Sequence, residues 1–218
     1  MSRAQILGGG LLCMLAATTH GQPANHPGLN AQLLVAARLG EAPKVAALLQ
    51  QGAAVDSRNR FGKTALFMAS EKGQLELATA LLKAGASANV ETVERVTPLM
   101  AASYGGHAAI VKLLLASGAQ TAALDRMQKP AFVYAAGQGH TEVLRLLLDH
   151  GVDVNAIYAN QLTALMWAVG QGHLAAAQLL LARGAKTELR DDRGLTALEI
   201  ARRAGHASLV ALMAEPKS

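Results

Sequence analysis

The chain has 218 residues, of which 51% are hydrophobic and 16% are charged, and its formal net charge is +5. This composition excludes a disordered chain, because the apolar content is large enough to build a continuous core. A single cysteine excludes a fold held together by internal disulfides.

The N-terminal segment 1–21 is typical of a secretory signal peptide. Arg3 precedes an uninterrupted apolar run from Ile6 to Ala17, and small and polar residues follow up to Gln22. This run fits a signal core of about 7–15 residues and falls short of the roughly 20 that a membrane-spanning helix needs. We therefore expect export with cleavage before Gln22 or after Ala17, the alternative being an uncleaved anchor. The chain has no Asn-x-Ser/Thr glycosylation site, which favours a bacterial periplasm or secretion from it.

A short linker is predicted at residues 22–29, because it holds two prolines and a glycine without periodicity. After the linker the chain repeats with a constant period of about 33 residues, without insertion or deletion, which indicates one elongated array of stacked repeats. The periodic glycines are Gly40, Gly73, Gly106, Gly139, Gly172 and Gly205. We predict about six repeats within residues 30–214, at 30–58, 59–91, 92–124, 125–157, 158–190 and 191–214, and a tail at 215–218.

Each repeat is predicted to hold two short helices and a loop. In the second repeat Thr64 is a good N-cap, because its hydroxyl accepts a hydrogen bond from an otherwise unpaired backbone N–H. The first helix then runs to about Lys72, and Gly73 ends it in a left-handed conformation. A second helix follows and ends at Gly85, and its apolar face consists of Leu75, Leu77, Ala78, Leu81 and Leu82.

These motifs resemble the ankyrin repeat family over residues 30 to 214. The matching strings are Gly62-Lys-Thr-Ala-Leu66, Thr97-Pro-Leu-Met-Ala-Ala102, Gly139-His-Thr-Glu-Val-Leu-Arg-Leu-Leu-Leu148, Gly151-Val-Asp-Val-Asn155 and Gly194-Leu-Thr-Ala-Leu198. The resemblance implies an all-α repeat solenoid with β-hairpin-like connecting loops. It also implies a concave face lined by loops and first helices, and a role in protein–protein recognition.

Several positions depart from the family pattern. The turn glycine is kept at Gly62 and Gly194, but the three central repeats have Arg95, Gln128 and Gln161. Pro130 stands at a helix cap without a side-chain oxygen, which weakens that helix start by about 1 kcal/mol. The family's first-helix histidine is replaced by Phe67, Met100, Val133, Met166 and Glu199. Recognition or relaxed selection in the middle repeats would each explain these changes.

No catalytic, cofactor or metal signature is present, since the chain has no His-Glu-x-x-His motif, phosphate-binding loop or nucleophile elbow. We therefore expect a protein that is not an enzyme and that binds no cofactor or metal. One histidine per repeat gives a spacing of about 8–10 Å, too wide for one metal site, so we expect these side chains to pack or to form hydrogen bonds. They are His107, His140, His173 and His206.

The pair Asp191 and Asp192, beside Arg190 and Arg193, is interpreted as a solvated turn held by ion pairs, with a cation site as the less favoured reading. The basic residues of the loops favour an acidic partner, or they only keep the chain soluble. Nucleic acid is disfavoured, because basic residues do not cluster with aromatic ones.

All seven aromatic residues fall in loops or first helices. Phe132, Tyr134 and Trp167 are predicted to lie in the core, whereas Phe61 and Tyr104 are predicted to be exposed, as is Tyr158. Exposed aromatic residues together with arginine are typical of recognition surfaces.

The sequence therefore predicts an exported monomer that binds another protein and, once the signal is removed, no membrane. The alternative is an inhibitor or immunity protein that neutralises a secreted enzyme or toxin. The candidate binding residues are Arg60, Phe61, Lys63, Lys72, Glu94, Tyr104, Arg126, Met127, Lys129, Gln138, Tyr158, Asn160 and Gln171.

Overall fold

The computed structural model describes residues 26–214, so the predicted signal peptide, the first half of the linker and the tail lie outside the described residues. The described part contains twelve α-helices, one short 3-10 helix (Ala159–Gln161) and no strand. The first helices of the repeats are α1 (Pro27–Leu39), α3 (Ala65–Glu71), α5 (Pro98–Tyr104), α7 (Ala131–Gln138), α9 (Ala164–Gly170) and α11 (Ala197–Arg203). The second helices are α2 (Ala42–Gln50), α4 (Leu75–Lys83), α6 (Ala108–Ala116), α8 (Thr141–Asp149), α10 (Leu174–Ala182) and α12 (Ala207–Ala214).

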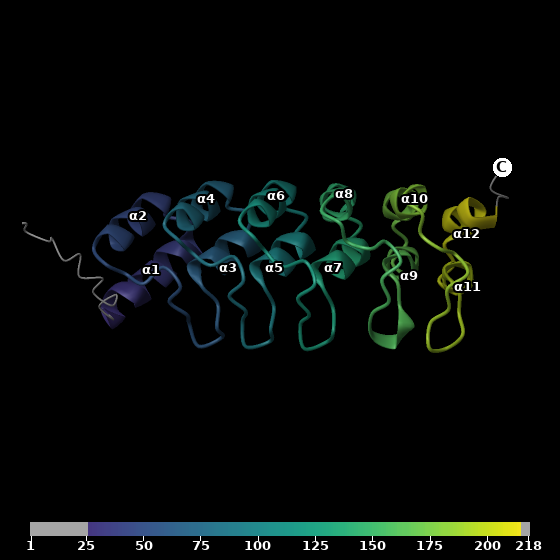
Figure 1. Cartoon of the computed structure of the whole chain (residues 1–218), viewed down its shortest axis with the longest axis horizontal. Coiled ribbons are helices and arrows are strands. Elements are labelled where there is room, and N and C mark those ends of the chain that lie inside the picture. The colour runs from purple at the N-terminus through teal and green to yellow at the C-terminus, as the bar shows by residue number, and fades with distance from the viewer. Residues whose placement is uncertain (1–25, 215–218) are drawn as a thin grey trace, which may run out of the picture.

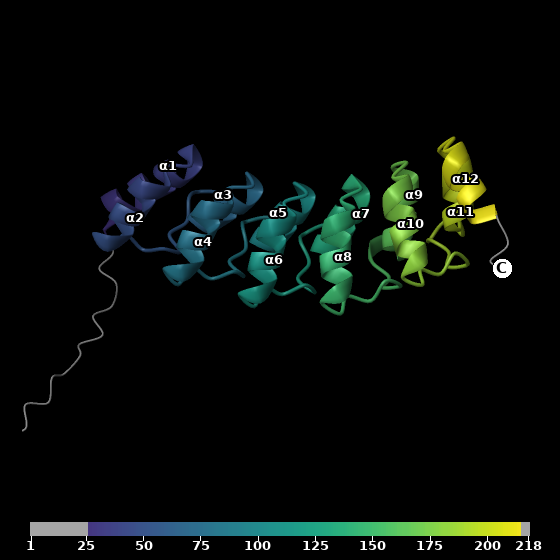
Figure 2. The same ribbon diagram turned by 90° about the horizontal axis from the view of Figure 1, so that it is seen from above.

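The helix pairs stack side by side in a row, as Figure 1 shows. First helices pack against first helices of neighbouring repeats, and second helices pack against second helices. The loops all project on the side of the first helices, away from the second helices (Figure 1). Seen from above, the row bends gently along its length (Figure 2). We call the surface formed by the loops and the first helices the loop-side face.

Threonine caps start most of the first helices, as predicted. The Thr64 hydroxyl accepts a hydrogen bond from the backbone nitrogen of Phe67 at 3.1 Å, and Thr97, Thr163 and Thr196 make the equivalent bond. Pro130 caps α7 without any side-chain hydrogen bond, also as predicted. The repeat pattern therefore sets where each first helix begins.

Both helix layers of the core contain small and large buried apolar residues. One alanine of each first helix, such as Ala69 or Ala102, is completely buried and lets neighbouring first helices approach closely. One leucine of each second helix fills the space between the layers, and Leu81, Leu114 and Leu147 are inaccessible to solvent. The core is therefore continuous from the first repeat to the last.

The periodic glycines and histidines contact each other across repeats. The ring of His140 lies against Gly106, and its Nε2 donates to the carbonyl oxygen of Tyr104 at 2.9 Å. The equivalent histidines of three other repeats make the same bond to the end of the preceding first helix: His107, His173 and His206. The predicted packing and hydrogen-bonding role of these histidines is confirmed.

Each loop is a tight turn closed by hydrogen bonds, and none contains an assigned strand within residues 26–214. In the loop at 125–129 the Asp125 carboxylate accepts the backbone N–H groups of Met127 and Lys129, both at 2.8 Å. In each loop the next-to-last residue has a positive φ. Glycine adopts this left-handed conformation without strain, as at Gly62 and Gly194. The same conformation is imposed on the residues that replace glycine, namely Arg95, Gln128 and Gln161.

The first helix begins earlier than the sequence predicted. α1 starts at Pro27, inside the expected linker at 22–29. Proline is favourable in the first turn of a helix, because the N–H that it lacks would have no partner there. Pro27 and Gly28 therefore belong to the repeat domain and not to the linker.

Candidate functional site

An apolar groove of the loop-side face lies over α3 and α5 and has a volume of about 710 Å³. Phe61, at the tip of the first loop, and Tyr104, at the end of α5, line it while remaining 54% and 55% exposed. Buried side chains of the first helices, among them Phe67 and Met100, complete its lining. The groove therefore combines an apolar floor with accessible aromatic residues.

A charged pair forms part of the wall of this groove. Lys63 donates from Nζ to both carboxylate oxygens of Glu71, at 2.8 and 3.0 Å. The same ammonium group lies 5.0 Å from the centre of the Phe67 ring, within the range of a cation–π contact. Lys63 is thus oriented by two contacts and stays partly exposed.

A smaller pocket of about 180 Å³ continues the surface toward α9. Here Lys129 places Nζ 4.5 Å from the centre of the Trp167 ring. Tyr104 and Tyr134 line both pockets, and their rings meet edge to face with centroids 5.9 Å apart. We call the two pockets together the loop-side groove.

Tyr134 is held in place by the turn that carries Lys129. Its hydroxyl donates a hydrogen bond to the Asp125 carboxylate, which is buried. Burial raises the pKa of the Tyr134 phenol well above its usual range, and the hydrogen bond and negative charge of Asp125 raise it further. The phenol is therefore neutral at physiological pH, and its role in the groove is to orient and to pack rather than to exchange a proton.

The cations near the groove differ in their partners. Lys63 pairs with Glu71, and Arg126 pairs with Glu94 at 3.7 Å. Arg60 and Lys129, in contrast, have no carboxylate of the described chain within ion-pair distance, and each lies over an aromatic ring. These two cations are available to an acidic group from outside.

The structure brings together seven of the thirteen predicted binding residues. The loop-side groove is lined by Phe61, Lys63, Glu94, Tyr104, Lys129, Gln138 and Gln171. The remaining six do not line it: Arg60, Lys72, Arg126, Met127, Tyr158 and Asn160. Arg60 stacks on Phe61, and Lys72 donates to the carbonyl oxygen of Arg38 in the preceding repeat.

Three aromatic side chains lie differently from the prediction. Tyr158 is half-buried, and burial together with the charge of Asp153 raises its pKa to about 12. Tyr134 and Trp167, expected in the core, are partly exposed in the loop-side groove. Only Phe132 is fully buried as expected. Exposure differs because the residues occupy different positions of the first helix: Phe132 is one period before the buried Leu165, whereas Tyr134 and Trp167 share a position that is partly exposed in both repeats.

Sequence reasoning also missed Phe67 and Met100 as groove residues. Both stand three positions after a threonine cap, where the family's histidine is replaced. That departure was the available signal, because a larger apolar side chain in a first helix enlarges an apolar surface beside the loops.

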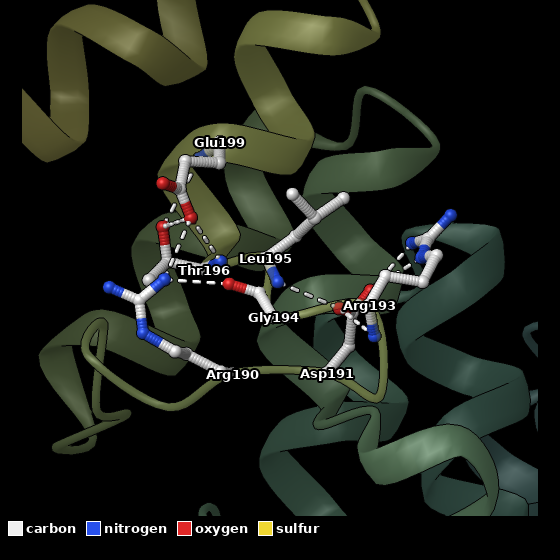
Figure 3. Close-up of polar contacts among 7 residues, drawn as sticks. All are labelled: Arg190, Asp191, Arg193, Gly194, Leu195, Thr196 and Glu199. Carbon is white, nitrogen blue, oxygen red and sulfur yellow. Dashed lines mark hydrogen bonds and ion pairs between the residues drawn. The ribbon is translucent and has the colours of Figure 1, made fainter.

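The turn at Asp191 and Asp192 is held by an ion pair and Asp192 is exposed, as predicted, but Asp191 is not solvated. Its side chain is buried and accepts the backbone N–H groups of Arg193 and Leu195 at 3.0 and 2.9 Å, as Figure 3 shows. Arg193 adds an ion pair at 2.6 Å. Burial acts to raise the pKa of Asp191, but these hydrogen bonds and the Arg193 charge outweigh it and leave the pKa below its usual value. The carboxylate closes the turn and is not a free cation ligand.

Between residues 26 and 214, no three histidine, cysteine or acidic side chains come together in a way that could hold a metal ion. In the same range, every helix is too short or too polar to cross a membrane.

Comparison with known proteins identifies the repeat. A family model described as ankyrin repeats (3 copies) matches residues 11–92, 33–125, 84–158 and 132–218. No match was found among curated proteins.

Proposed function

Since the chain belongs to the ankyrin repeat family, whose members generally bind other proteins, we propose that it is a non-enzymatic module that binds an acidic protein partner through the loop-side groove. The observation that carries this proposal is the groove itself, in which Phe61 and Tyr104 are each about half exposed around an apolar cavity. Aromatic side chains of this kind supply most of the binding energy at protein interfaces.

The charges of the face support an acidic partner. Arg60 and Lys129 lie near the two ends of the groove without a carboxylate partner in the described chain. A partner carboxylate at either position would gain an ion pair without displacing an internal one. Such contacts accelerate association and are screened by salt. We further propose, from the predicted signal peptide, that the encounter takes place in the periplasm or outside the cell.

The test begins with capture of the partner. A photoreactive phenylalanine analogue placed at Tyr104 should cross-link the partner in the exported fraction, and the same analogue at Leu75, on the second helices, should not. The captured protein is then identified and purified. If it is a secreted enzyme or toxin whose activity falls on binding, the role is that of an inhibitor.

Binding of the purified partner then tests the groove. The variant F61A/Y104A should raise the Kd at least about tenfold, since two exposed aromatic contacts are lost. The matched control L75A/L174A removes two exposed apolar side chains of the second helices and should leave the Kd unchanged. Equal binding by a folded F61A/Y104A variant would show that the groove is not the interface.

A further inference from the structure

Asparagine side chains bridge neighbouring repeats at two junctions of the array. The Asn89 carboxamide accepts the backbone N–H of Gln120 at 2.9 Å and donates to the carbonyl oxygen of Gly118 at 3.0 Å. Asn155 makes the same two bonds, to Lys186 at 2.8 Å and to Gly184 at 3.1 Å. The backbone of the following repeat therefore presents a donor and an acceptor that together fit one carboxamide.

The junction between these two lacks the bridge. Ala122 stands one repeat period after Asn89 and one period before Asn155, and its methyl group cannot form the bonds. The corresponding backbone groups are the N–H of Asp153 and the carbonyl oxygen of Gly151. Within the described residues, neither group has a hydrogen-bond partner. Both therefore keep the bonding capacity that a carboxamide uses elsewhere in the array.

A cavity of about 380 Å³ opens at this junction. Ala122, Gly151 and Asp153 line it, and Ile157 and Tyr158 add apolar surface. Ile157 is exposed, so the cavity is accessible from solvent.

The loops beside the cavity are not tied together. Other neighbouring loops are joined by a backbone hydrogen bond, such as that from Val93 to Phe61 or from Asp192 to Asn160. Within residues 26–214, no such bond joins the loop at 125–129 to the loop at 158–162, the one with the 3-10 helix in Figure 1. This junction therefore lacks both the asparagine bridge and the loop-to-loop hydrogen bond that join other neighbouring repeats.

We propose that this cavity is a second binding site, which takes the carboxamide of an asparagine or glutamine side chain from a partner protein. The carboxamide oxygen accepts the N–H of Asp153, and its amino group donates to Gly151. The partner's adjoining backbone and methylene groups pack against Ile157 and Tyr158, which a free small amide could not cover. The site shares no residue with the loop-side groove, so a negative result at this site would not contradict the proposed function.

The array itself indicates why a carboxamide fits better than a carboxylate. Asp56 stands at the equivalent position of an earlier junction and accepts the N–H of Ser87 at 3.1 Å. A carboxylate has no proton to donate to a glycine carbonyl oxygen, whereas a carboxamide satisfies both backbone groups.

Amide chemical shifts of the isotopically labelled protein test the site. Titration with N-acetyl-asparagine N-methylamide should shift the backbone amide signal of Asp153 in a saturable manner. N-acetyl-aspartate N-methylamide should bind more weakly, because it makes only one of the two bonds. Acetamide lacks the apolar contacts and should bind about threefold more weakly or worse. Equal affinity for acetamide would assign the site to free small amides and overturn the proposal of a protein side chain.

Two variants provide matched controls. A122N supplies its own carboxamide and should abolish the shift at Asp153, while N89A should create a second site reported by the amide of Gln120. If N89A does not fold, N155A makes the same test at Lys186. No saturable shift at Asp153 in the natural protein, or an unchanged shift in A122N, would overturn the proposal.

Discussion

The imidazole of His140 occupies the space beside Gly106 that a side chain would need: a Cβ on Gly106 would lie 2.6 Å from the ring. Gly106 also has a φ of 72°, a conformation that residues with a Cβ rarely adopt. Two separate constraints therefore require glycine here, one from the backbone and one from the next repeat. The same pair recurs at Gly73, Gly139 and Gly172, whereas Gly40 meets Gln74 and Gly205 meets no other atom within 4 Å.

This relationship predicts different costs for two alanine substitutions. Gly205 has a φ of 76° but nothing within 4 Å of a built Cβ, so G205A should lower the free energy of unfolding by about 1 kcal/mol through backbone strain alone. G106A should cost about 1–2 kcal/mol more, because the His140 ring must move and lose its bond to Tyr104. Urea unfolding measures both, and equal losses would show that the ring contact contributes nothing.

Restoring the missing helix cap should stabilise the fourth repeat. P130T would give α7 the hydroxyl that Thr64 or Thr163 provides in other repeats. We expect the free energy of unfolding to rise by up to about 1 kcal/mol, since the gain of a cap is partly offset by the freer unfolded chain. P130A is the control and should bring no gain. Thermal unfolding followed by circular dichroism makes the comparison.

Relieving a strained turn should also stabilise the chain. Gln128 is exposed and has a φ of 58°, so Q128G should raise the free energy of unfolding by up to about 1 kcal/mol. Gly194 has a φ of 75°, and a Cβ built on it would meet no other atom. The reverse change, G194A, should therefore lower the free energy of unfolding by about the same amount. A stability loss in Q128G, measured by urea unfolding, would mean that the glutamine side chain makes a stabilising contribution that outweighs the strain.

Low pH should destabilise the last repeat. Burial opposes the ionisation of Asp191, but hydrogen bonds and the charge of Arg193 hold its pKa below the usual 3.8. Hydrogen bonds from Thr196 lower the pKa of Glu199 below its usual 4.5. A lowered folded-state pKa means that the stabilisation is present above the unfolded pKa and is lost as the pH falls through the folded value. The hydrogen-exchange protection factors of α11, corrected for the intrinsic pH dependence of exchange, should therefore fall below about pH 4.

The matched variants for this acid effect are D191N and D192N. D191N should remove much of the acid dependence of exchange in α11, because the buried carboxylate is gone. D192N changes an exposed carboxylate of the same turn and should leave the dependence intact. The same acid dependence in D191N as in the natural protein would contradict the assignment.

The periodic features of the fold could be predicted from the sequence. Thr64 and Gly73 begin and end a helix through bonds and backbone angles that are local to the chain, and α3 lies where they place it. Exposed Phe61 and Tyr104 could also be predicted, since a loop tip and a helix end are rarely covered by a neighbour. About half of the candidate binding residues line one groove for this reason.

What the sequence alone determined is therefore the repeat, its helix ends and the face on which its aromatic residues gather, because each follows from interactions within a single repeat unit. The tertiary structure decided which of these residues are covered. Asp191 is buried, Tyr158 is half-buried, Trp167 is partly exposed, and the junction at Ala122 lacks its bridge. Asp191 is paired within its own turn, but the asparagine bridges depend on what the adjacent repeat places against the side chain, and they join residues about one repeat apart in the chain.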